Sequence, residues 1–402
     1  MISWRTNDLS GSEIRVATPT HEEKLVTQGG KSGSIEIHWL EDSTEYEFRL
    51  YPASRRHKSV DSVRVKRSSN SFHPLLAEAE LEVTRGNIGV AALSRFIAKV
   101  LPPCVHDAKF REIFRIWERH GFHVTPVHFY QPIPNTQSLP ETVWNRPSEL
   151  VGIDMNDAMQ LDLLRNHFPK FRSEYGEFPV ELADGPVRFH LNNGLFDATD
   201  ALIAYCMIRH FQPRLIIEVG SGFSSLVAAE AISKNRDSTL ICIEPFPPDF
   251  LRKRVPGLHS LLEKNVEDVD LEFFSQLQSG DILFIDSSHT VRIGGDVNYL
   301  FLEVLPRLKP GVIVHVHDIF FPFDYRRDWV IDELRFWAEQ YLLQAFLTFN
   351  SEFEVLMANG YLGHRYIEDL KATFPNSPWW GGGSFWMRRR PVEAAHCLGG
   401  KA

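Results

Sequence analysis

The residues that most constrain the fold run from Leu215 to Ser225 and read Leu-Ile-Ile-Glu-Val-Gly-Ser-Gly-Phe-Ser-Ser. An apolar run that ends in an acid, two glycines and then two serines predicts a buried strand, a tight turn and the start of a helix. The first turn of this kind in an open α/β sheet is where nucleotide-like ligands bind. We therefore expect a ligand site at this turn.

The spacing of the turn narrows the kind of ligand. The pattern is Glu218-x-Gly220-x-Gly222, which differs from the Gly-x-Gly-x-x-Gly of dinucleotide enzymes and so disfavours a dehydrogenase. No Lys-Ser/Thr pair follows it, so it is not a phosphate-binding P-loop either. An acid directly before the turn favours a ligand that carries positive charge over a pyrophosphate.

From residue 214 onward, apolar strand-like runs alternate with segments of helical periodicity. Strands are predicted at residues 215–219, 239–243, 281–285, 311–316, 342–349 and 384–387, with a further short element at 258–262. Helices are predicted at residues 224–235, 271–278, 296–308 and 328–340. This alternation predicts a doubly wound α/β domain, with a seven-stranded, mostly parallel sheet whose last two strands form a hairpin.

The segments before this domain differ from it in pattern. Period-two alternation at residues 35–39, 46–51 and 60–65 predicts a small antiparallel β-domain, preceded by about 30 loosely ordered polar residues. Helical periodicity over residues 88–120 and five prolines between residues 126 and 150 predict a connecting segment or a lid. The predicted organisation is therefore a β-rich accessory domain (1–87), a helical and proline-rich segment (88–185), the α/β domain (186–391) and a flexible tail (392–402).

Charge and composition exclude several classes of partner. The net charge of −9 makes nucleic acid an unexpected partner, and the absence of an 18-residue apolar run argues against a membrane span. The four cysteines have no paired spacing, so neither a disulfide framework nor a zinc site is expected. The first residues lack the apolar core of a signal peptide, and we expect a cytoplasmic protein.

Polar residues follow the predicted strands at the sheet edge where ligands bind. Glu244 ends the second strand, at the place where an acid commonly accepts two hydrogen bonds from a ribose diol. Asp286 and His289 follow the fourth strand, and His317-Asp318 follow the fifth. Carboxylates and imidazole that converge here indicate a divalent-metal site, with oxygen ligands favouring Mg²⁺ or Mn²⁺ and a histidine favouring Mn²⁺, Fe²⁺ or Zn²⁺.

These polar residues also allow a structural interpretation. In it, Asp286 and Asp318 cap loops and His317 hydrogen-bonds a backbone carbonyl. In the metal-site interpretation, His289 is free to act as a base. His315 alternates inward on its strand and is expected to be a hydrogen-bonded core histidine.

The Glu218–Gly222 turn, Glu244 and the strand at 281–286 resemble the first three motifs of class I S-adenosylmethionine-dependent methyltransferases, over roughly residues 190–390. The resemblance implies a Rossmann-like methyltransferase fold with S-adenosylmethionine as cofactor. The cofactor-binding residues that it implies are Glu218, Gly220, Ser221, Gly222, Ser224, Ser225, Glu244, Asp286 and Ser287.

Within that fold, Asp286-x-x-His289 followed by His317-Asp318 is similar to the metal-dependent O-methyltransferases that act on sugar hydroxyls of macrolides, and more distantly to the catechol type. This similarity implies Asp286, His317 and Asp318 as metal ligands and His289 as the catalytic base, although the sugar enzymes have a carboxylate where His317 stands. The string from Gly311 to Tyr325 also resembles a bacterial methyltransferase group.

The predicted function is therefore O-methylation of a hydroxyl on a sugar or another small natural-product acceptor, assisted by Mg²⁺ or Mn²⁺. The alternatives are a metal-independent methyltransferase of the same fold, an oxygenase-like chemistry on this fold, and a non-catalytic cofactor-binding scaffold. Association into a homo-oligomer is left open. The acceptor pocket is expected to draw on residues 318–326, Asn192-Asn193, residues 130–146 and residues 379–383.

Overall fold

The chain divides by its contacts into two units, Met1–Pro126 and Val127–Ala402, which are described separately. The computed structural model describes residues 2–5, 11–18, 21–30, 32–35, 45–53, 59–66, 94, 108–182, 187–253 and 255–391. The predicted boundaries at residues 87/88 and 185/186 lie outside these ranges, as does the tail from residue 392, so the predicted domain limits stay predictions.

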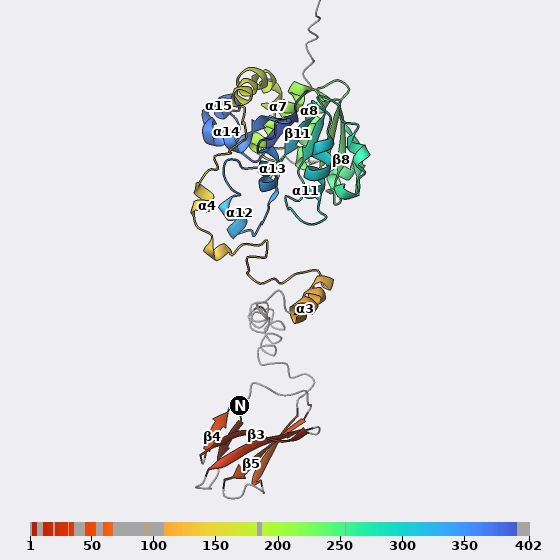
Figure 1. Ribbon diagram of the computed structural model, residues 1–402. Coiled ribbons are helices and arrows are strands. Elements are labelled where there is room, and N and C mark those ends of the chain that lie inside the picture. Colours follow the sequence, from red (N-terminus) through yellow and green to blue (C-terminus); the bar gives the residue numbers. More distant parts are fainter. Residues whose placement is uncertain are drawn as a thin grey trace, which may run out of the picture. The chain divides into compact units, whose positions relative to one another are not determined.

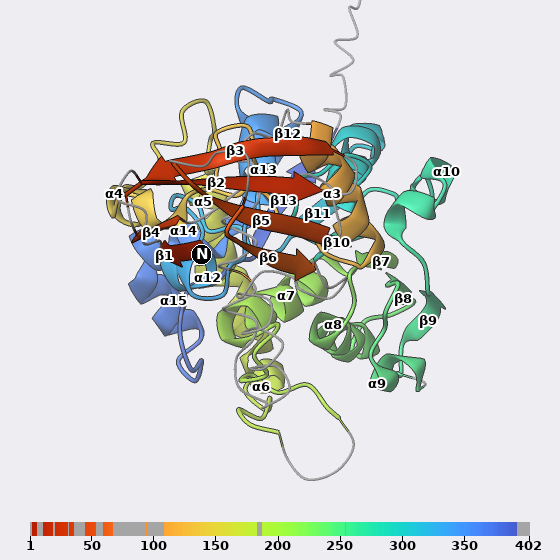
Figure 2. The ribbon, with the colours of Figure 1, turned by 90° about the horizontal axis from the view of Figure 1, so that it is seen from below.

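The first unit contains two antiparallel sheets, which Figure 2 shows in red and orange. The larger sheet has the order β3-β2-β5-β6 and the smaller pairs β1 with β4. Their bounds are β1 Ile2–Arg5, β2 Ser12–Thr18, β3 His21–Gly29, β4 Ser32–Ile35, β5 Glu45–Pro52 and β6 Asp61–Lys66. Alternate residues of β2 and β5, among them Ile14, Val16 and Phe48, form its small core.

The expectation that the first 30 or so residues are loosely ordered was wrong, because strands β1, β2 and β3 lie there. An antiparallel sheet can leave one face in water, so its strands can be rich in polar residues and still pair. The strands predicted at residues 46–51 and 60–65 are confirmed as β5 and β6. Within the predicted helical segment, α3 (Ala108–Arg119) is confirmed, while residues 88–93 and 95–107 lie outside the described residues.

The second unit is built on a seven-stranded sheet with the order β12-β13-β11-β10-β7-β8-β9 (Figure 1). The bounds are β7 Leu215–Val219, β8 Thr239–Ile243, β9 Leu258–Leu262, β10 Ile282–Ile285, β11 Ile313–Val316, β12 Phe353–Ala358 and β13 Phe385–Arg389. The five neighbouring strands β11, β10, β7, β8 and β9 pair in parallel. Strand β13 runs antiparallel to both of its neighbours, β11 and β12. The chain moves outward from β7 to β9 and then returns to β10, so a topological switch point lies between β7 and β10.

Helices and shorter turns connect these strands. The α-helices are α4 Thr142–Asn145, α5 Asp157–Asp162, α6 Arg172–Tyr175, α7 Ala198–Phe211, α8 Phe223–Ser233, α9 Asp249–Arg252, α10 Leu271–Phe274, α11 Asp296–Asn298, α12 Arg327–Ile331, α13 Glu339–Leu347, α14 Asn359–Arg365 and α15 Ile367–Thr373. Helix α11 continues through a π-helical segment, η5 (Tyr299–Val304), and a 3₁₀ turn, η6 (Leu305–Arg307). In the proline-rich segment, only η1 (Thr136–Ser138) and α4 are regular, as the proline density predicts.

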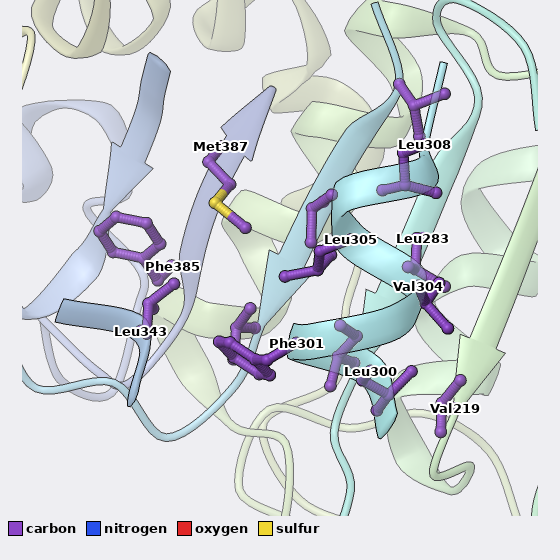
Figure 3. Close-up of a cluster of buried hydrophobic side chains, with 14 of the residues drawn as sticks. Val219, Leu283, Leu300, Phe301, Val304, Leu305, Leu308, Leu343, Phe385 and Met387 are labelled. Carbon is purple, nitrogen blue, oxygen red and sulfur yellow. The ribbon is translucent and has the colours of Figure 1, made fainter. Parts of the chain in front are cut away.

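Both faces of this sheet are buried. Alternate residues of each strand enter different clusters, so Ile217 and Leu283 belong to one core and Ile216 and Ile282 to the other. Figure 3 shows the first core, in which Leu300 and Leu305 of the η5–η6 segment cover the sheet together with residues of α13. Helices α7 and α8 supply the second core. The predicted doubly wound, mostly parallel sheet is therefore confirmed. Its last two strands, β12 and β13, pair antiparallel as expected, but α14 and α15 lie between them, so they do not form a hairpin.

One predicted strand was wrong. The sequence analysis assigned a helix to residues 328–340 and a strand to residues 342–349. The structure instead has helix α13 at residues 339–347, and the strand follows later, as β12. The segment reads Glu-Gln-Tyr-Leu-Leu-Gln-Ala-Phe-Leu, which is rich in helix-forming residues. Leu343 and Leu347, four residues apart, both face the core, as one face of a helix requires.

Candidate active site

The glycine turn after β7 is held against the end of β10. Gly220 has φ +77°, and a Cβ atom at this position would lie 1.7 Å from the backbone carbonyl oxygen of Asp286. Glycine is therefore required here by both backbone conformation and space. Gly222, by contrast, would have nothing within 4 Å of a Cβ atom, so the space before helix α8 is open.

Glu218 lies beneath this turn and is buried, with 1% of its surface exposed. Its Oε2 accepts hydrogen bonds from Ser225 Oγ at 2.5 Å and Cys242 Sγ at 3.2 Å, while its buried Oε1 has no partner in the described structure. Burial raises the pKa of Glu218 to about 7, against the opposing effect of the hydrogen bonds from Ser225 and Ser224. A buried carboxylate oxygen without a donor is a position where a cationic ligand group fits.

Glu244 borders a cavity of about 310 Å³ that lies beside the turn. Its two carboxylate oxygens accept hydrogen bonds from the backbone N–H groups of Ser221 at 3.2 Å and Phe246 at 2.8 Å, which fix the acid at the cavity wall. The lining residues are Val219, Gly220, Ile243, Glu244, Pro245, Phe246, Asn265, Val266, Glu267, Asp286, Ser287, Ser288, Arg292 and Asp296. Among the described residues, the buried hydroxyl oxygens of Ser221 and Ser287 also have no hydrogen-bond partner.

The second half of the site lies where β10 and β11 end. Asp286, His289 and Asp318 each place one potential ligand atom so that the three atoms lie within 4.8 Å of one another. His289 Nε2 is 3.4 Å from Asp286 Oδ1 and also 3.4 Å from Asp318 Oδ2. The structure thus brings together three of the four polar residues that the sequence singled out after these strands. A divalent ion fits a set of two carboxylates and one imidazole.

His317 lies beside this group. Its Nδ1 is 3.4 Å from Asp286 Oδ1 and 3.7 Å from Asp318 Oδ1, and its buried Nε2 faces Asp200 Oδ2 at 3.6 Å. Sequence reasoning missed Asp200, which lies on α7. The only signal for it was an acid in the first turn of a buried, apolar helix.

Glu339 is the second residue that sequence reasoning missed. It is the first residue of α13, is 1% exposed, and its Oε2 accepts a hydrogen bond from His289 Nδ1 at 2.8 Å. The backbone N–H groups of Ala338 and Glu339 donate to the carbonyl oxygen of His289 at 2.9 and 3.1 Å. The ring of Trp337 also packs against the His289 ring, with 4.4 Å between centroids. The sequence-based prediction placed residue 339 near the end of a helix at residues 328–340, and no motif or spacing linked it to His289.

The charges of the cluster depend on these contacts. Burial by itself would lower the pKa of His289, but its hydrogen bonds to Asp286 and Glu339 raise that pKa to about 10. Burial would raise the pKa of Asp286, yet the nearby charges of His317 and His289 hold it well below its usual range. For Asp318, burial dominates and raises the pKa. Without a metal ion, a proton on His289 offsets the surrounding carboxylates, and a bound cation would supply that positive charge in place of the proton.

His315 does not belong to this cluster. It is fully buried, its Nε2 lies 3.0 Å from Ser384 Oγ, and burial lowers its pKa well below the usual value. The prediction of a hydrogen-bonded core histidine is therefore confirmed.

A second cavity, of about 770 Å³, is bordered by Thr290, which follows His289, and by Trp337, whose ring packs against the His289 ring. It is lined by Pro132, Ile133, Pro134, Leu139, Val143, Trp144, Thr290, Val291, Arg292, Asp324, Tyr325, Val330, Leu334, Arg335, Phe336, Trp337, Ala338 and Tyr341. Arg292 lines both cavities, which are therefore neighbours. Two of the four segments expected at the acceptor pocket, residues 130–146 and 318–326, contribute to this lining.

The other two expected segments do not line this cavity. Asn193 uses its side-chain amide to hold its own loop, donating to the carbonyl oxygens of His190 and Phe196 at 2.8 Å. The carbonyl oxygen of Trp379 accepts a hydrogen bond from Thr199 Oγ1, which attaches that segment to α7.

Within the described part of the chain, no helix has the length and apolar character needed to cross a membrane.

Comparisons with known proteins match the region that contains the site. A family model described as a methyltransferase domain matches residues 217–319, from β7 to the loop after β11, and this range includes every site residue predicted from the sequence. An uncharacterized protein of Archaeoglobus fulgidus is 35% identical over 169 residues, which cover 39% of this chain and 75% of that protein.

Two solved structures are more distantly similar. The O-methyltransferase TomG from Streptomyces achromogenes, in complex with S-adenosylmethionine, is 15% identical with a TM-score of 0.32, and the match covers 60% of this chain and 92% of TomG. An O-methyltransferase from Bacillus cereus, in complex with S-adenosylhomocysteine, is 12% identical with a TM-score of 0.27, and the match covers 56% and 90% of the two chains. Similarities at these TM-scores are too low to support a conclusion. The domain match, which falls on the glycine turn and the strand ends described above, and the relative at 35% identity show that the chain belongs to the class I S-adenosylmethionine-dependent methyltransferases.

Proposed function

We propose that this methyltransferase O-methylates a hydroxyl group of a small-molecule acceptor with the help of a divalent metal ion. One observation carries the proposal: Asp286 lines the cavity beside the glycine turn and also belongs to the group of Asp286, His289 and Asp318. The proposed site for the methyl donor and the proposed metal site thus share Asp286, at the switch point of the sheet. This arrangement would bring the methyl donor and the acceptor hydroxyl together.

The cofactor side follows from the first cavity. Glu218 would face the ammonium group of the methionine part, and the backbone at Gly220 and Gly222 would allow its close approach. Glu244 would accept hydrogen bonds from the ribose hydroxyls. Ser221, Ser224, Ser225, Asp286 and Ser287 complete the cofactor-binding set inferred from the sequence. S-adenosylmethionine supplies an electrophilic methyl group, so the protein contributes mainly position and charge.

The metal side supplies what a hydroxyl acceptor lacks. An alcohol is a weak nucleophile at neutral pH, and a divalent ion held by Asp286 and Asp318 would lower its pKa. Mg²⁺ and Mn²⁺ both accept carboxylate ligands. The base predicted from the sequence is His289, and that role requires a free lone pair on Nε2, because Nδ1 is already bound to Glu339.

The larger cavity supports an acceptor with a substantial apolar part. Its wall is mostly proline, aliphatic and aromatic side chains, and Ile133, Leu334 and Tyr341 in this wall are each at least 45% exposed. Free sugars are polar on most of their surface, whereas a glycosylated or ring-bearing natural product offers an apolar face. The proposed acceptor is therefore a hydroxylated natural product of this kind rather than a free sugar.

A test of the proposed function combines cofactor binding with product mass. We expect S-adenosylhomocysteine to bind the full chain in calorimetry, and Glu244→Gln to weaken that binding at least about tenfold, or 1.4 kcal/mol. Glu263→Gln, on an exposed ion pair with Arg252, is the matched control and should leave the affinity unchanged. A screen of hydroxylated natural products should yield a product heavier by about 14 Da, the mass of CH₂, rather than about 16 Da for an inserted oxygen.

The outcomes separate the alternatives. Activity that survives exhaustive treatment with EDTA would indicate the metal-independent methyltransferase. Binding of S-adenosylhomocysteine without turnover on any acceptor, in the presence of Mg²⁺ or Mn²⁺, would favour the non-catalytic scaffold.

A further inference from the structure

We propose that His289 is itself a ligand of the metal ion through Nε2, that Glu339 is the outer carboxylate that positions it, and that the site takes a first-row transition ion such as Mn²⁺ in preference to Mg²⁺. The inference rests on the proposed metal-dependent function and changes the role that the sequence assigned to His289. It concerns a set of residues from three elements: Asp286 and His289 after β10, Asp318 after β11, and Glu339 at the start of α13.

The distances around His289 Nε2 suit an ion better than a hydrogen bond. The nitrogen is equally far, at 3.4 Å, from one oxygen of Asp286 and one oxygen of Asp318. A charge-assisted N–H···O bond is typically about 2.7–2.9 Å long, and one ring N–H group points at one acceptor. Neighbouring ligand atoms around an ion with bonds of about 2.1 Å lie about 3 Å apart in octahedral geometry. Small adjustments of the three side chains would therefore close the group around a central ion.

Glu339 gives the imidazole the orientation that a ligand needs. Its buried carboxylate accepts from Nδ1 at 2.8 Å, which places the hydrogen on Nδ1 and leaves the lone pair of Nε2 directed at the two aspartates. Metal-ligating histidines commonly donate their second ring nitrogen to a carboxylate in this way, and the contact raises the basicity of the ligand. The short segment of Trp337, Ala338 and Glu339 holds the His289 ring and backbone at the same time.

The backbone around the group is also strained. His289 and Asp318 both have φ +57°, in the left-handed region that few non-glycine residues adopt. Such conformations cost about 1–3 kcal/mol each and persist where the surrounding structure enforces them, most often at functional sites. Two of the three proposed ligands therefore depend on strained turns that aim their side chains at a common point.

Two consequences follow for the chemistry. A nitrogen lone pair that binds a metal cannot accept a proton, so His289 would not serve as the base, and the acceptor hydroxyl, made more acidic by the ion, would lose its proton to solvent water. An imidazole ligand beside two carboxylates shifts the preference from Mg²⁺, which favours oxygen, toward Mn²⁺. His317 lies beside the group, near Asp200, Asp286 and Asp318, and carries no ligand role in this arrangement.

The test uses the full chain loaded with S-adenosylhomocysteine and titrated with Mn²⁺, with free Mn²⁺ followed by electron paramagnetic resonance. We expect His289→Gln to weaken Mn²⁺ binding at least about a hundredfold and Glu339→Gln to weaken it about 10–100-fold. Glu333→Gln is the matched control, because Glu333 pairs with Arg335 at the surface and should not affect the metal. Unchanged affinity for S-adenosylhomocysteine shows that each variant is folded.

A measurement on the unmodified protein makes the test independent of how the variants fold. Pulsed electron paramagnetic resonance of the Mn²⁺-loaded chain should show the coupling of a directly bound imidazole nitrogen, and this coupling should disappear in His289→Gln. A bound Mn²⁺ without nitrogen coupling, or His289→Gln affinity within threefold of the unmodified chain, would overturn the ligand role and leave the proposed function intact. If the unmodified chain binds no Mn²⁺ but still methylates an acceptor, the metal part of the proposed function fails as well.

Discussion

Gly220 and Asp286 lie in contact across two neighbouring strand ends, and a single added methyl group on Gly220 would reach to 1.7 Å from the Asp286 carbonyl oxygen. The backbone of Gly220 also has φ +77°, which an alanine adopts only with strain. Gly220→Ala should therefore lower the free energy of unfolding by at least about 3 kcal/mol, measured by urea denaturation. A loss below about 1 kcal/mol would show that the two strand ends separate easily.

Gly222→Ala is the matched substitution two residues away. A Cβ atom there has no neighbour within 4 Å, and φ is −172°, which any residue adopts. We expect the stability to change by less than about 1 kcal/mol. If the cofactor approaches this turn, the same methyl group should weaken S-adenosylhomocysteine binding at least about tenfold in calorimetry, or 1.4 kcal/mol.

Glu218 should make the stability of the cofactor-free protein depend on pH. Its folded-state pKa of about 7 lies above the usual 4.5, so the neutral form is favoured by folding. The stabilisation is fully present below pH 4.5 and is lost as the pH rises through 7, for a total of about 3 kcal/mol at 1.36 kcal/mol for each pKa unit. Glu218→Gln cannot ionise, so its free energy of unfolding should lack this loss. Parallel pH curves for the two proteins would contradict the role of burial.

Asp200 should be a large contributor to stability near the site. Its buried carboxylate accepts hydrogen bonds from the backbone N–H groups of Gly383 and Ser384 at 3.0 and 2.8 Å, and from Asn359 Nδ2 at 2.7 Å. Asp200→Ala leaves these donors and the facing His317 without an acceptor, and should cost about 3–5 kcal/mol in chemical denaturation. Asp249→Ala, at a side chain that is 90% exposed, should change stability by no more than about 0.5 kcal/mol.

Leu334 should contribute to binding of apolar molecules in the larger cavity. It is 59% exposed and lines that cavity, so Leu334→Asp adds a charge to an apolar wall with little effect on packing. The fluorescence of 8-anilinonaphthalene-1-sulfonate should report at least about fivefold weaker binding, because a carboxylate in the wall disfavours contact with the apolar rings of the probe and repels its sulfonate group. Leu302→Asp, at a residue 56% exposed and outside the cavity, serves as the control. Equal loss in both variants would mean that the probe binds elsewhere.

The strand–turn–helix unit at Leu215–Ser233 could be predicted because every signal for it is local. Apolar runs mark β7, β8, β10 and β11, and glycines mark the turn, whatever the rest of the chain does. Local signals were not sufficient for helix α13, because a short apolar run without a capping residue does not distinguish a strand from a helix.

The sequence by itself determined the parallel sheet, the glycine turn and the order of the polar residues that end its strands. Only the tertiary structure decided which residues complete the site, because His289 meets Glu339 across 50 positions and His317 meets Asp200 from a helix that precedes the sheet. The periodicity of a segment specifies which of its faces is buried. It does not specify which residue of another segment will lie opposite, since that depends on how α7 and α13 pack on the two faces of the sheet.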